Sequence, residues 1–301
     1  MTYLTIFTAP KAFTNPHINL IQRNALQNWV HLGPEVAVLM MGQEVGMPEV
    51  AAEMGIRNVH EVKCNEAGPP LISSMIAYAR ELTDSPYLCI SNADVLYFSD
   101  VISATQAMAR LSENFVILGQ RWDLDVRQEI DFSPGWQERL WQDVQQRGRM
   151  HPPLGSDYFI FPRQLLADIP DFTIGRSGWD NWIIYHALQR GWDIVDATHS
   201  LRLVHQNHDY SHLPGNRPPY KLPETKKNIA LAGGEENMLT ILDLPNQLVK
   251  GKIRPAPLTF SRLVRKLEVA LTPKEKQRRG LRWRLTRQVR KLRRRLTDDR
   301  Q

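Results

Sequence analysis

A chain of 301 residues with 42% hydrophobic residues can bury a large core, as one large α/β domain or two smaller ones, which excludes a disordered protein. Its net charge of +6 combines +10 for residues 274–301 with −4 for residues 1–273, so the basic character belongs to the tail and the body does not resemble a specific nucleic-acid reader. No window approaches the roughly 20 consecutive apolar residues of a membrane span, and the N-terminus lacks a signal-peptide pattern, so we expect a cytoplasmic protein.

Apolar strands alternate with helices through the first part of the chain. Asn15 and Pro16 mark the start of the first helix. The alternation predicts an α/β fold with a mainly parallel sheet covered by helices on both faces. The expected strands are 3–7, 36–41, 59–62, 87–91 and 115–119, and the expected helices are 17–30, 48–54, 71–82 and 101–111.

The pattern changes after residue 119. Residues 120–153 combine tryptophans with charged residues, which is typical of a loop-rich insertion with one helix at 136–147. Residues 207–223 are dense in His, Pro and Gly and are expected to form a loop. Further strands are expected at 157–162, 193–198 and 201–205, and a helix at 179–189.

The only two cysteines are Cys64 and Cys89. Neither has a partner at the spacing of a metal site or a redox motif. We therefore expect both to be buried as small hydrophobic residues.

A carboxylate interrupts the apolar run YLCISNADVLYF at 87–98. Asp94 should lie at the end of its strand, because an unpaired carboxylate inside a sheet is costly. Ligands of such sheets bind outside the carboxyl ends of the strands, where the turns TAPK (8–11) and GQE (42–44) are also expected. Asp94 is thus a candidate ligand-binding residue, and the alternative is a helix cap or a turn residue.

The segment GWDNW (178–182) opens an apolar helix. Asp180 falls in its first turn, where the helix dipole favours the ionised carboxylate. Such a carboxylate beside an apolar wall is a candidate general base for an alcohol. The alternative is again a capping role.

Two further segments contain polar groups suited to ligands. The segment VHQNHDYSH (204–212) offers His205, His208 and His212 as candidate metal ligands. A single imidazole together with a carboxylate and a diphosphate is a suitable donor set for Mn2+ or Mg2+. His205 is the preferred ligand because it ends a strand. GSDYFIFPR (155–163) places Asp157 at the start of a strand, where it could accept hydrogen bonds from sugar hydroxyls beside stacking indoles. The alternatives are surface or supporting histidines, and core packing with a turn.

Together these residues resemble the GT-A fold glycosyltransferases, which use nucleotide-diphospho-sugars and have a Rossmann-like N-terminal half. The resemblance covers roughly residues 3–210 and implies that Asn92-Ala93-Asp94 stands at the strand-end D-x-D motif. Asn92 replaces the first aspartate there and weakens the site for Mn2+ or Mg2+. In this resemblance Asp94 and His205 would bind the metal, and Asp180 would be the catalytic base of an inverting transfer.

The resemblance also implies binding residues for both substrates. The acceptor would lie against Trp122, Asp157 and Trp179. Residues 1–257 would form the catalytic domain, with a nucleotide-binding half at 1–119 and an acceptor half at 120–223. The donor would lie against Thr8, Ala9, Pro10, Asn65, Gly68, Asn92, Ala93, Asp94 and, as a second cation for its phosphates, Arg121.

The tail at 258–301 contains leucines at steps of three and four residues, with arginines between them. This pattern predicts a basic amphipathic helix that lies on an anionic membrane surface, at the inner face, near a lipid-linked or other glycan acceptor. The alternative is a solvated helix or a disordered tail that binds RNA adventitiously.

Two other functions fit parts of the sequence. A nucleotidyltransferase on a related sheet would usually carry a glycine-rich basic loop after the first strand, and residues 8–16 contain Lys11 but no glycine. A binding or scaffold protein that has kept the fold and lost the metal would account for Asn92. The sequence leaves the sugar, the base, the acceptor and the choice between inversion and retention open.

Overall fold

The computed structural model describes residues 2–209, 222–273 and 280–298. Its helices are α1 (Pro16–Val30), α2 (Met47–Met54), α3 (Ile72–Leu82), α4 (Asp100–Leu111), α5 (Trp136–Arg147), α6 (Trp179–Gln189), α7 (Pro223–Leu231), α8 (Phe260–Leu271) and α9 (Gly280–Asp298), with short 3-10 turns η3 (Glu235–Asn237) and η4 (Ile241–Asp243). Its strands are β1 (Leu4–Thr8), β2 (Val36–Met41), β3 (Arg57–Val59), β4 (Tyr87–Ser91), β5 (Val95–Tyr97), β6 (Phe115–Leu118), β7 (Trp122–Leu124), β8 (Arg149–Met150), β9 (Tyr158–Pro162), β10 (Asp193–Asp196), β11 (Leu203–Gln206), β12 (Asn246–Val249) and β13 (Lys252–Pro255).

A nine-stranded sheet in the order β13-β12-β10-β6-β9-β4-β1-β2-β3 forms the centre of the fold. Neighbouring strands from β3 to β4 are parallel, as are β6, β10 and β12, while β9 and β13 pair antiparallel with their neighbours. The expected α/β fold with a mainly parallel sheet is therefore confirmed. β1, β4 and β6 run in one direction, so their carboxyl ends lie at the same edge.

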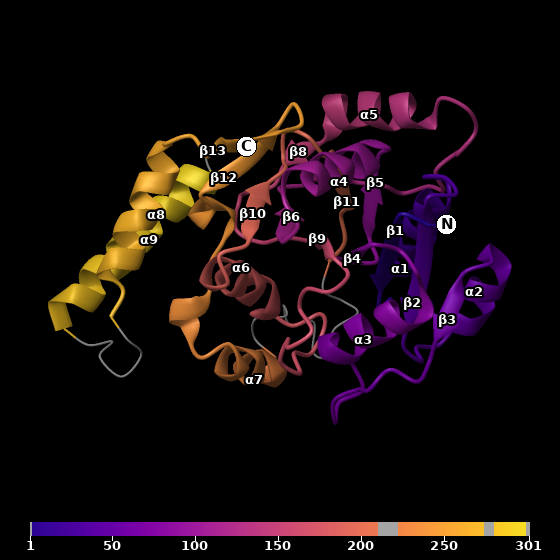
Figure 1. Cartoon of the computed structure of the whole chain (residues 1–301), viewed down its shortest axis with the longest axis horizontal. Coiled ribbons are helices and arrows are strands. Elements are labelled where there is room, and N and C mark those ends of the chain that lie inside the picture. The colour runs from indigo at the N-terminus through magenta and orange to yellow at the C-terminus, as the bar shows by residue number, and fades with distance from the viewer. Residues whose placement is uncertain (1, 210–221, 274–279, 299–301) are drawn as a thin grey trace.

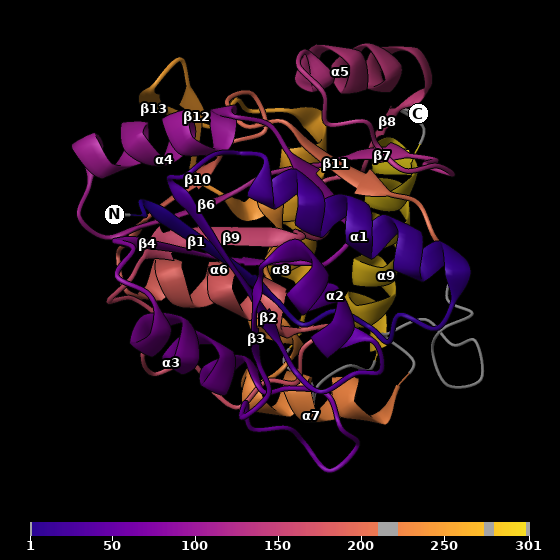
Figure 2. The same cartoon turned by 90° about the vertical axis from the view of Figure 1, so that its right-hand side faces the viewer.

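Helices cover both faces of this sheet. Successive side chains of a strand point to opposite faces, and in β1 Ile6 packs with α1 and α4 whereas Phe7 packs with α3 and α6. In Figure 1, α4 and α5 lie on one side of the sheet and α3, α6 and α7 on the other. Figure 2 shows the same layers after a quarter turn, with α1 in front.

The start of α1 follows from local chemistry. The side chain of Asn15 accepts hydrogen bonds from the backbone N–H groups of His17 and Ile18, and Pro16 occupies the first turn, where it needs no donor. This cap directs the chain from the end of β1 over the edge of the sheet. The loop between β1 and α1 is thereby held beside the ends of β4 and β6.

A second sheet, in the order β5-β11-β7-β8, was not expected from the sequence. Its strands have two to four residues, too short for an alternation of apolar and polar residues to be recognised. β11 pairs with β5 and with β7, so it lies between the chain that follows Asp94 and the chain that follows Arg121. This small sheet brings His205 to the carboxyl edge of the large one.

The expectation for Cys64 was wrong. Cys89 is fully buried in β4, but Cys64 is exposed. Cys64 lies in the connection from β3 to α3, beside the turn at residues 65–68, rather than in a strand. Its place in an irregular surface segment explains its exposure.

The basic amphipathic helix expected in the tail at 258–301 is present as α9, and an additional helix, α8, precedes it. α8 and α9 form an antiparallel pair of helices, which project from the body beside β12 and β13 (Figure 1). Residues 274–279, between the two helices, and residues 299–301, after α9, lie outside the described part of the chain. Among the helices that the structure describes, none is long and apolar enough to cross a membrane.

Candidate functional site

A cleft of about 810 Å³ opens at the carboxyl edge of the large sheet. The ends of β1, β4 and β6 and the start of β9 contribute to its wall, and α6 begins on its other side. The cleft is lined by Thr8, Ala9, Pro10, Lys11, Ala12, Thr14, Asn15, Gln22, Glu44, Pro69, Pro70, Ser91, Asn92, Ala93, Asp94, Arg121, Asp123, Gly155, Ser156, Asp157, Ile174, Gly175, Arg176, Ser177, Trp179, Asp180, His205, Asn207 and His208.

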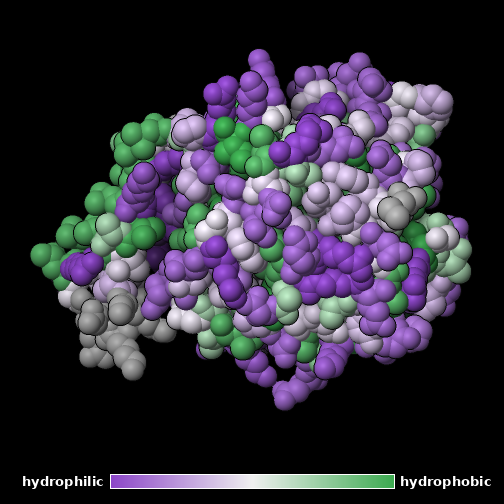
Figure 3. All heavy atoms as spheres, viewed as in Figure 1, coloured by the Kyte–Doolittle hydropathy of each residue, from purple (hydrophilic) through white to green (hydrophobic). Residues whose placement is uncertain are grey.

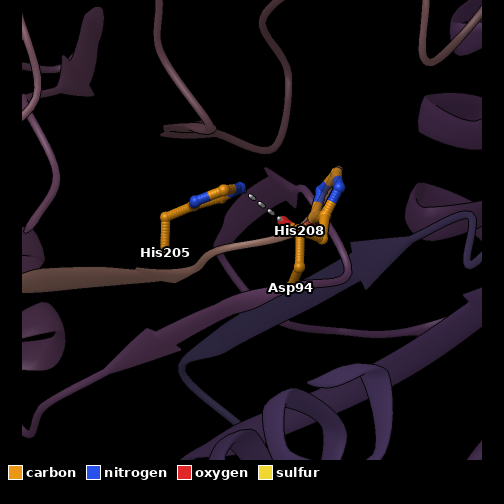
Figure 4. Close-up of side chains that lie close together, drawn as sticks. All are labelled: Asp94, His205 and His208. Atoms are coloured by element: carbon orange, nitrogen blue, oxygen red, sulfur yellow. Dashed lines mark hydrogen bonds and ion pairs between the residues drawn. The ribbon is translucent and has the colours of Figure 1, made fainter. Parts of the chain in front are cut away.

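Asp94 forms the centre of a cluster with two histidines. Its Oδ2 lies 3.1 Å from His208 Nε2 and its Oδ1 lies 3.8 Å from His205 Nε2. In Figure 4, His205 reaches the carboxylate from the end of β11 and His208 from the following loop. Lys11 Nζ approaches from the β1 loop, 3.7 Å from Asp94 Oδ2. His212, the third histidine considered from the sequence, lies outside the described residues.

The electrostatics of the cluster keep Asp94 ionised. Burial opposes its ionisation, but the charges and hydrogen bonds of His205, His208 and Lys11 outweigh burial and hold the pKa of Asp94 well below its usual range. The same contact affects Lys11, whose pKa is lowered by burial and partly restored by Asp94. The cleft therefore contains a carboxylate that remains charged at any physiological pH.

The cluster fits a divalent cation. The ligand atoms of Asp94, His205 and His208 all lie within 4.8 Å of one another. Asp94 Oδ1 is buried and makes no hydrogen bond, which leaves a lone pair directed at the space that an ion would fill. One carboxylate with two imidazoles is a suitable donor set for Mn2+, and a diphosphate could complete it.

Asn92 has a role that the sequence did not indicate. Its side-chain amide donates to Asp157 Oδ1 at 2.7 Å, and its backbone N–H donates to the Asp157 carbonyl at 2.8 Å. An aspartate at this position would place two carboxylates against each other. Asn92 therefore ties the end of β4 to the start of β9.

Arg121 is neutralised more fully than expected. Its Nη1 donates to both oxygens of Asp157, at 2.7 and 2.6 Å, and its Nε donates to Asp123 Oδ1 at 2.9 Å. Burial opposes its charge, but these carboxylates outweigh burial and raise the pKa of Arg121. A guanidinium held by two carboxylates has less charge to offer a phosphate, and Asp157 has few lone pairs left for an acceptor hydroxyl.

Asp123 is a site residue that the sequence reasoning missed. Its Oδ2 lies 2.7 Å from His151 Nδ1, and its Oδ1 lies 3.4 Å from Nδ1 of His205, the ring whose other nitrogen faces Asp94. Burial raises the pKa of Asp123, but His151, His205 and Arg121 outweigh burial and hold it well below the usual range. A carboxylate on one imidazole nitrogen orients the other nitrogen toward a metal.

We expect Asp123→Asn to weaken binding of Mn2+ to the protein about 10- to 100-fold, because such supporting carboxylates orient and polarise the ligand histidine. Calorimetric titration of Mn2+ into the protein without nucleotide measures this. The matched control is Asp125→Asn, a half-exposed carboxylate two residues away that pairs with Arg127 and should not change the affinity. Equal affinities for Asp123→Asn and the unchanged protein would contradict the assignment.

Asp180 lies across the cleft from this cluster, in the first turn of α6. Its side chain is half-buried, and desolvation raises its pKa to about 6, although the backbone N–H groups of Asn181 and Gly178 oppose the rise. Ionisation is thus less favoured than the helix dipole alone predicted. The hydrogen bond from Gly178 N to Asp180 Oδ1, 3.3 Å long, shows that the capping interaction also exists.

The other predicted residues fall into two groups. Thr8, Ala9, Pro10, Ala93 and Trp179 line the cleft, and Trp179 packs on Phe159. Asn65, Gly68 and Trp122 do not line it.

Each residue outside the lining has a local contact that explains its place. Asn65 accepts from Ala67 N at 2.8 Å and donates to Thr173 at 3.0 Å, so its side chain closes its own turn. Gly68 completes that turn with a φ of 103°, which favours glycine. The ring of Trp122 packs edge-on against Trp141, away from the cleft.

No family model matches the sequence, and no curated protein matches it. Among solved structures, the chain is similar to glucosyl-3-phosphoglycerate synthase from Mycobacterium tuberculosis, with 15% identity, a TM-score of 0.46, and coverage of 86% of this chain and 88% of that chain.

Two further solved structures are also similar. The mannosyltransferase PcManGT from Pyrobaculum calidifontis, in complex with GDP-Man and Mn2+, has 12% identity and a TM-score of 0.44 over 69% of this chain and 58% of that chain. TarS 1–349 from S. aureus has 12% identity and a TM-score of 0.40 over 69% and 59%. These similarities leave the donor, the acceptor and the mechanism to the side chains of the cleft.

Proposed function

We propose that the protein is a glycosyltransferase that moves a sugar from a nucleoside diphosphate donor to a glycan or lipid-linked acceptor. The observation that carries the proposal is the pairing of two groups in one cleft: a cation-binding cluster around Asp94, and a half-buried carboxylate, Asp180, whose pKa is about 6. A diphosphate leaving group needs a cation that offsets its charge, and an acceptor hydroxyl needs a base that takes its proton.

The donor half of the cleft lies at the ends of β1 and β4. Asp94, His205 and His208 would hold Mn2+ or Mg2+, which when bound offsets the charge of the diphosphate. Lys11 is the cation we assign to the phosphates in place of Arg121, because its ammonium lies at the cluster and is 35% exposed. The loop of Thr8, Ala9 and Pro10 would contact the nucleoside.

The acceptor half lies at the start of α6. Asp180 would accept the proton of the acceptor hydroxyl, whose oxygen forms a bond to the anomeric carbon while the bond from that carbon to the diphosphate breaks. Attack from the face opposite the leaving group inverts the anomeric centre. Trp179, beside Asp180 in the lining, would pack on the acceptor, and Arg121 with Asp157 would hold the wall between the two halves.

We also propose that the acceptor is met at an anionic membrane surface, on its inner face, through the C-terminal helices. This assignment places the enzyme at the periphery of the membrane. It rests on the charge of residues 274–301, which is +10 in total.

A nucleotide screen tests the function. We expect one of UDP, GDP, CDP, dTDP and ADP to raise the thermal midpoint in the presence of Mn2+ but not in its absence. At 100 times its dissociation constant the ligand adds about 2.7 kcal/mol of stability, which corresponds to a shift of roughly 4 °C for a chain of this size.

The screen includes Mn2+ alone and the matching nucleoside monophosphates as controls. A shift that needs both the metal and the diphosphate supports the donor assignment. No shift with any diphosphate, on protein that melts cooperatively, would contradict the enzyme and favour a scaffold in which Asn92 and Lys11 have replaced the metal.

A further inference from the structure

The contact between α8 and α9 is polar. Glu268 of α8 is 1% exposed and accepts hydrogen bonds from Nε of Arg290, at 2.8 Å, and Nε of Arg293, at 2.5 Å. The hydroxyl of Thr286 donates to the carbonyl of Leu271 at 2.9 Å. Burial opposes the charge of Glu268, but the arginines outweigh burial and lower its pKa. These contacts determine which face of α9 turns toward α8.

The apolar face of the helix pair therefore points outward. The exposed apolar residues recur at steps of three and four in α8 and of four and seven in α9, so those of each helix share one face. In Figure 3 the apolar residues, in green, gather along the outer side of this part of the molecule. We call the following six residues, which are 44% to 74% exposed, the outer row: Phe260, Leu263 and Leu267 of α8, and Leu281, Leu285 and Leu292 of α9.

The outer row is not needed to attach the helices to the body. Arg262 Nη1 donates to the carbonyls of Leu242 and Leu244, at 3.1 and 2.6 Å. Arg265 Nε donates to Asp243 at 3.0 Å. The buried arginines thus anchor α8 through polar contacts, and the apolar side chains remain available to a partner.

Basic side chains flank the outer row. Glu268 is the only acid between residues 260 and 274, and none occurs between 280 and 297. A second copy of the chain would present the same positive charge and be repelled. Nucleic acid would satisfy the charge but not the apolar row. The exposed basic residues are Lys266, Arg282, Arg284, Arg287, Lys291, Arg294 and Arg295.

We propose that the outer row inserts into an anionic lipid bilayer, with the flanking basic residues at the headgroup phosphates. Apolar insertion combined with a basic rim is the pattern of helices that lie in a membrane interface. The salt-bridged contact at Glu268 holds the two helices in the orientation that exposes the row. This inference deepens the membrane part of the proposed function, and binding to vesicles tests it without any transfer reaction.

The experiment is flotation of the full chain with vesicles of phosphatidylcholine alone or with 30% phosphatidylglycerol. We expect binding to the anionic vesicles only. The double variant Leu263→Ser/Leu285→Ser should lower the partition at least about tenfold, while Leu111→Ser, a matched change at a leucine of α4 that is 47% exposed, should not change it. Circular dichroism and the thermal midpoint report whether each variant is folded.

Three results would overturn the inference. One is binding to anionic vesicles that is unaffected by the leucine changes and equalled by binding to a single-stranded RNA of similar charge. Another is a dimer, measured by light scattering, that the double variant dissociates while vesicles bind neither protein. The third is no flotation with anionic vesicles by the unchanged, folded chain. None of these results bears on the diphosphate screen, so the two proposals fail separately.

Discussion

Replacing Asp94 by Asn should lower the rate of sugar transfer at least about a thousandfold, because the variant removes the carboxylate of the cation-binding cluster. It should also abolish the Mn2+-dependent thermal shift with the nucleoside diphosphate. The change leaves Lys11 and His208 without the charge they face at 3.7 and 3.1 Å. We therefore expect a loss of unfolding free energy of roughly 1 to 3 kcal/mol.

The sign of the pH dependence follows from the direction of the pKa shift. The pKa of Asp94 is lower in the folded protein than in the unfolded chain, so its ionised form stabilises the fold above the unfolded pKa. That stability is lost as the pH falls through the folded pKa. Asp94→Asn should accordingly cost most near neutral pH and little in strong acid.

The control is Asp84→Asn, an exposed aspartate in the loop before β4. It should leave both the thermal shift and the transfer rate unchanged. If Asp94→Asn kept full activity and an unchanged response to Mn2+, the site would be wrongly assigned. A variant that lost activity but kept tight Mn2+ binding would place the metal elsewhere.

Asp180→Asn should stabilise the folded protein, whereas Asp94→Asn should destabilise it, and both changes should lower the rate of sugar transfer. Removal of a general base lowers the rate by about 10²- to 10⁴-fold. The pKa of about 6 in the folded protein exceeds the ordinary aspartate pKa of 3.8, so the folded protein binds this proton more tightly than the unfolded chain. The associated stability is present below pH 4 and is lost as the pH rises through 6.

At pH 8 the half-buried, ionised carboxylate of Asp180 therefore destabilises the native protein. Asparagine keeps the oxygen that accepts the N–H of Gly178 and removes the charge, so Asp180→Asn should raise the unfolding free energy by roughly 1 to 3 kcal/mol at pH 8 and by little at pH 4. Chemical denaturation at the two pH values measures this difference. The transfer rate of the unchanged protein should fall as the pH drops below about 6.

Glu138→Gln is the matched control for Asp180→Asn. Glu138 also lies in the first turn of a helix, α5, that begins after a glycine with positive φ, but its side chain is exposed. It should alter neither the stability difference between the pH values nor the transfer rate. A fall in stability at pH 8 for Asp180→Asn, with activity retained, would assign Asp180 to helix capping alone.

Apolar runs along the chain were enough to predict most strands of the large sheet, but not β12 and β13. Runs such as YLCIS and FVIL form the buried strands β4 and β6, because a strand covered on both faces is apolar throughout. Asp94 and Asp180 stood out for the same reason, as carboxylates beside apolar runs. Local chemistry carries this information, so it can be read without the tertiary structure.

The roles of Arg121, Asn92 and Asp123 could not be read in this way. Each depends on a partner more than 25 residues away: Asp157 for Arg121 and Asn92, and His151 for Asp123. The sequence around an arginine does not show whether a carboxylate neutralises its charge in the folded protein. The segment RWDLD offered one signal for Asp123, a carboxylate two residues after Arg121 at a strand end.

The amino-acid sequence by itself determined the alternation of strands and helices in residues 3–119, the carboxylates at the strand and helix ends, and the basic, leucine-containing tail, because these depend on neighbours within a few residues. Only the tertiary structure decided which charges meet: Lys11 and two histidines at Asp94, two aspartates at Arg121, and two arginines at Glu268. The physical reason is that a charge acts on whatever lies within a few ångströms, and folding alone brings distant residues that close.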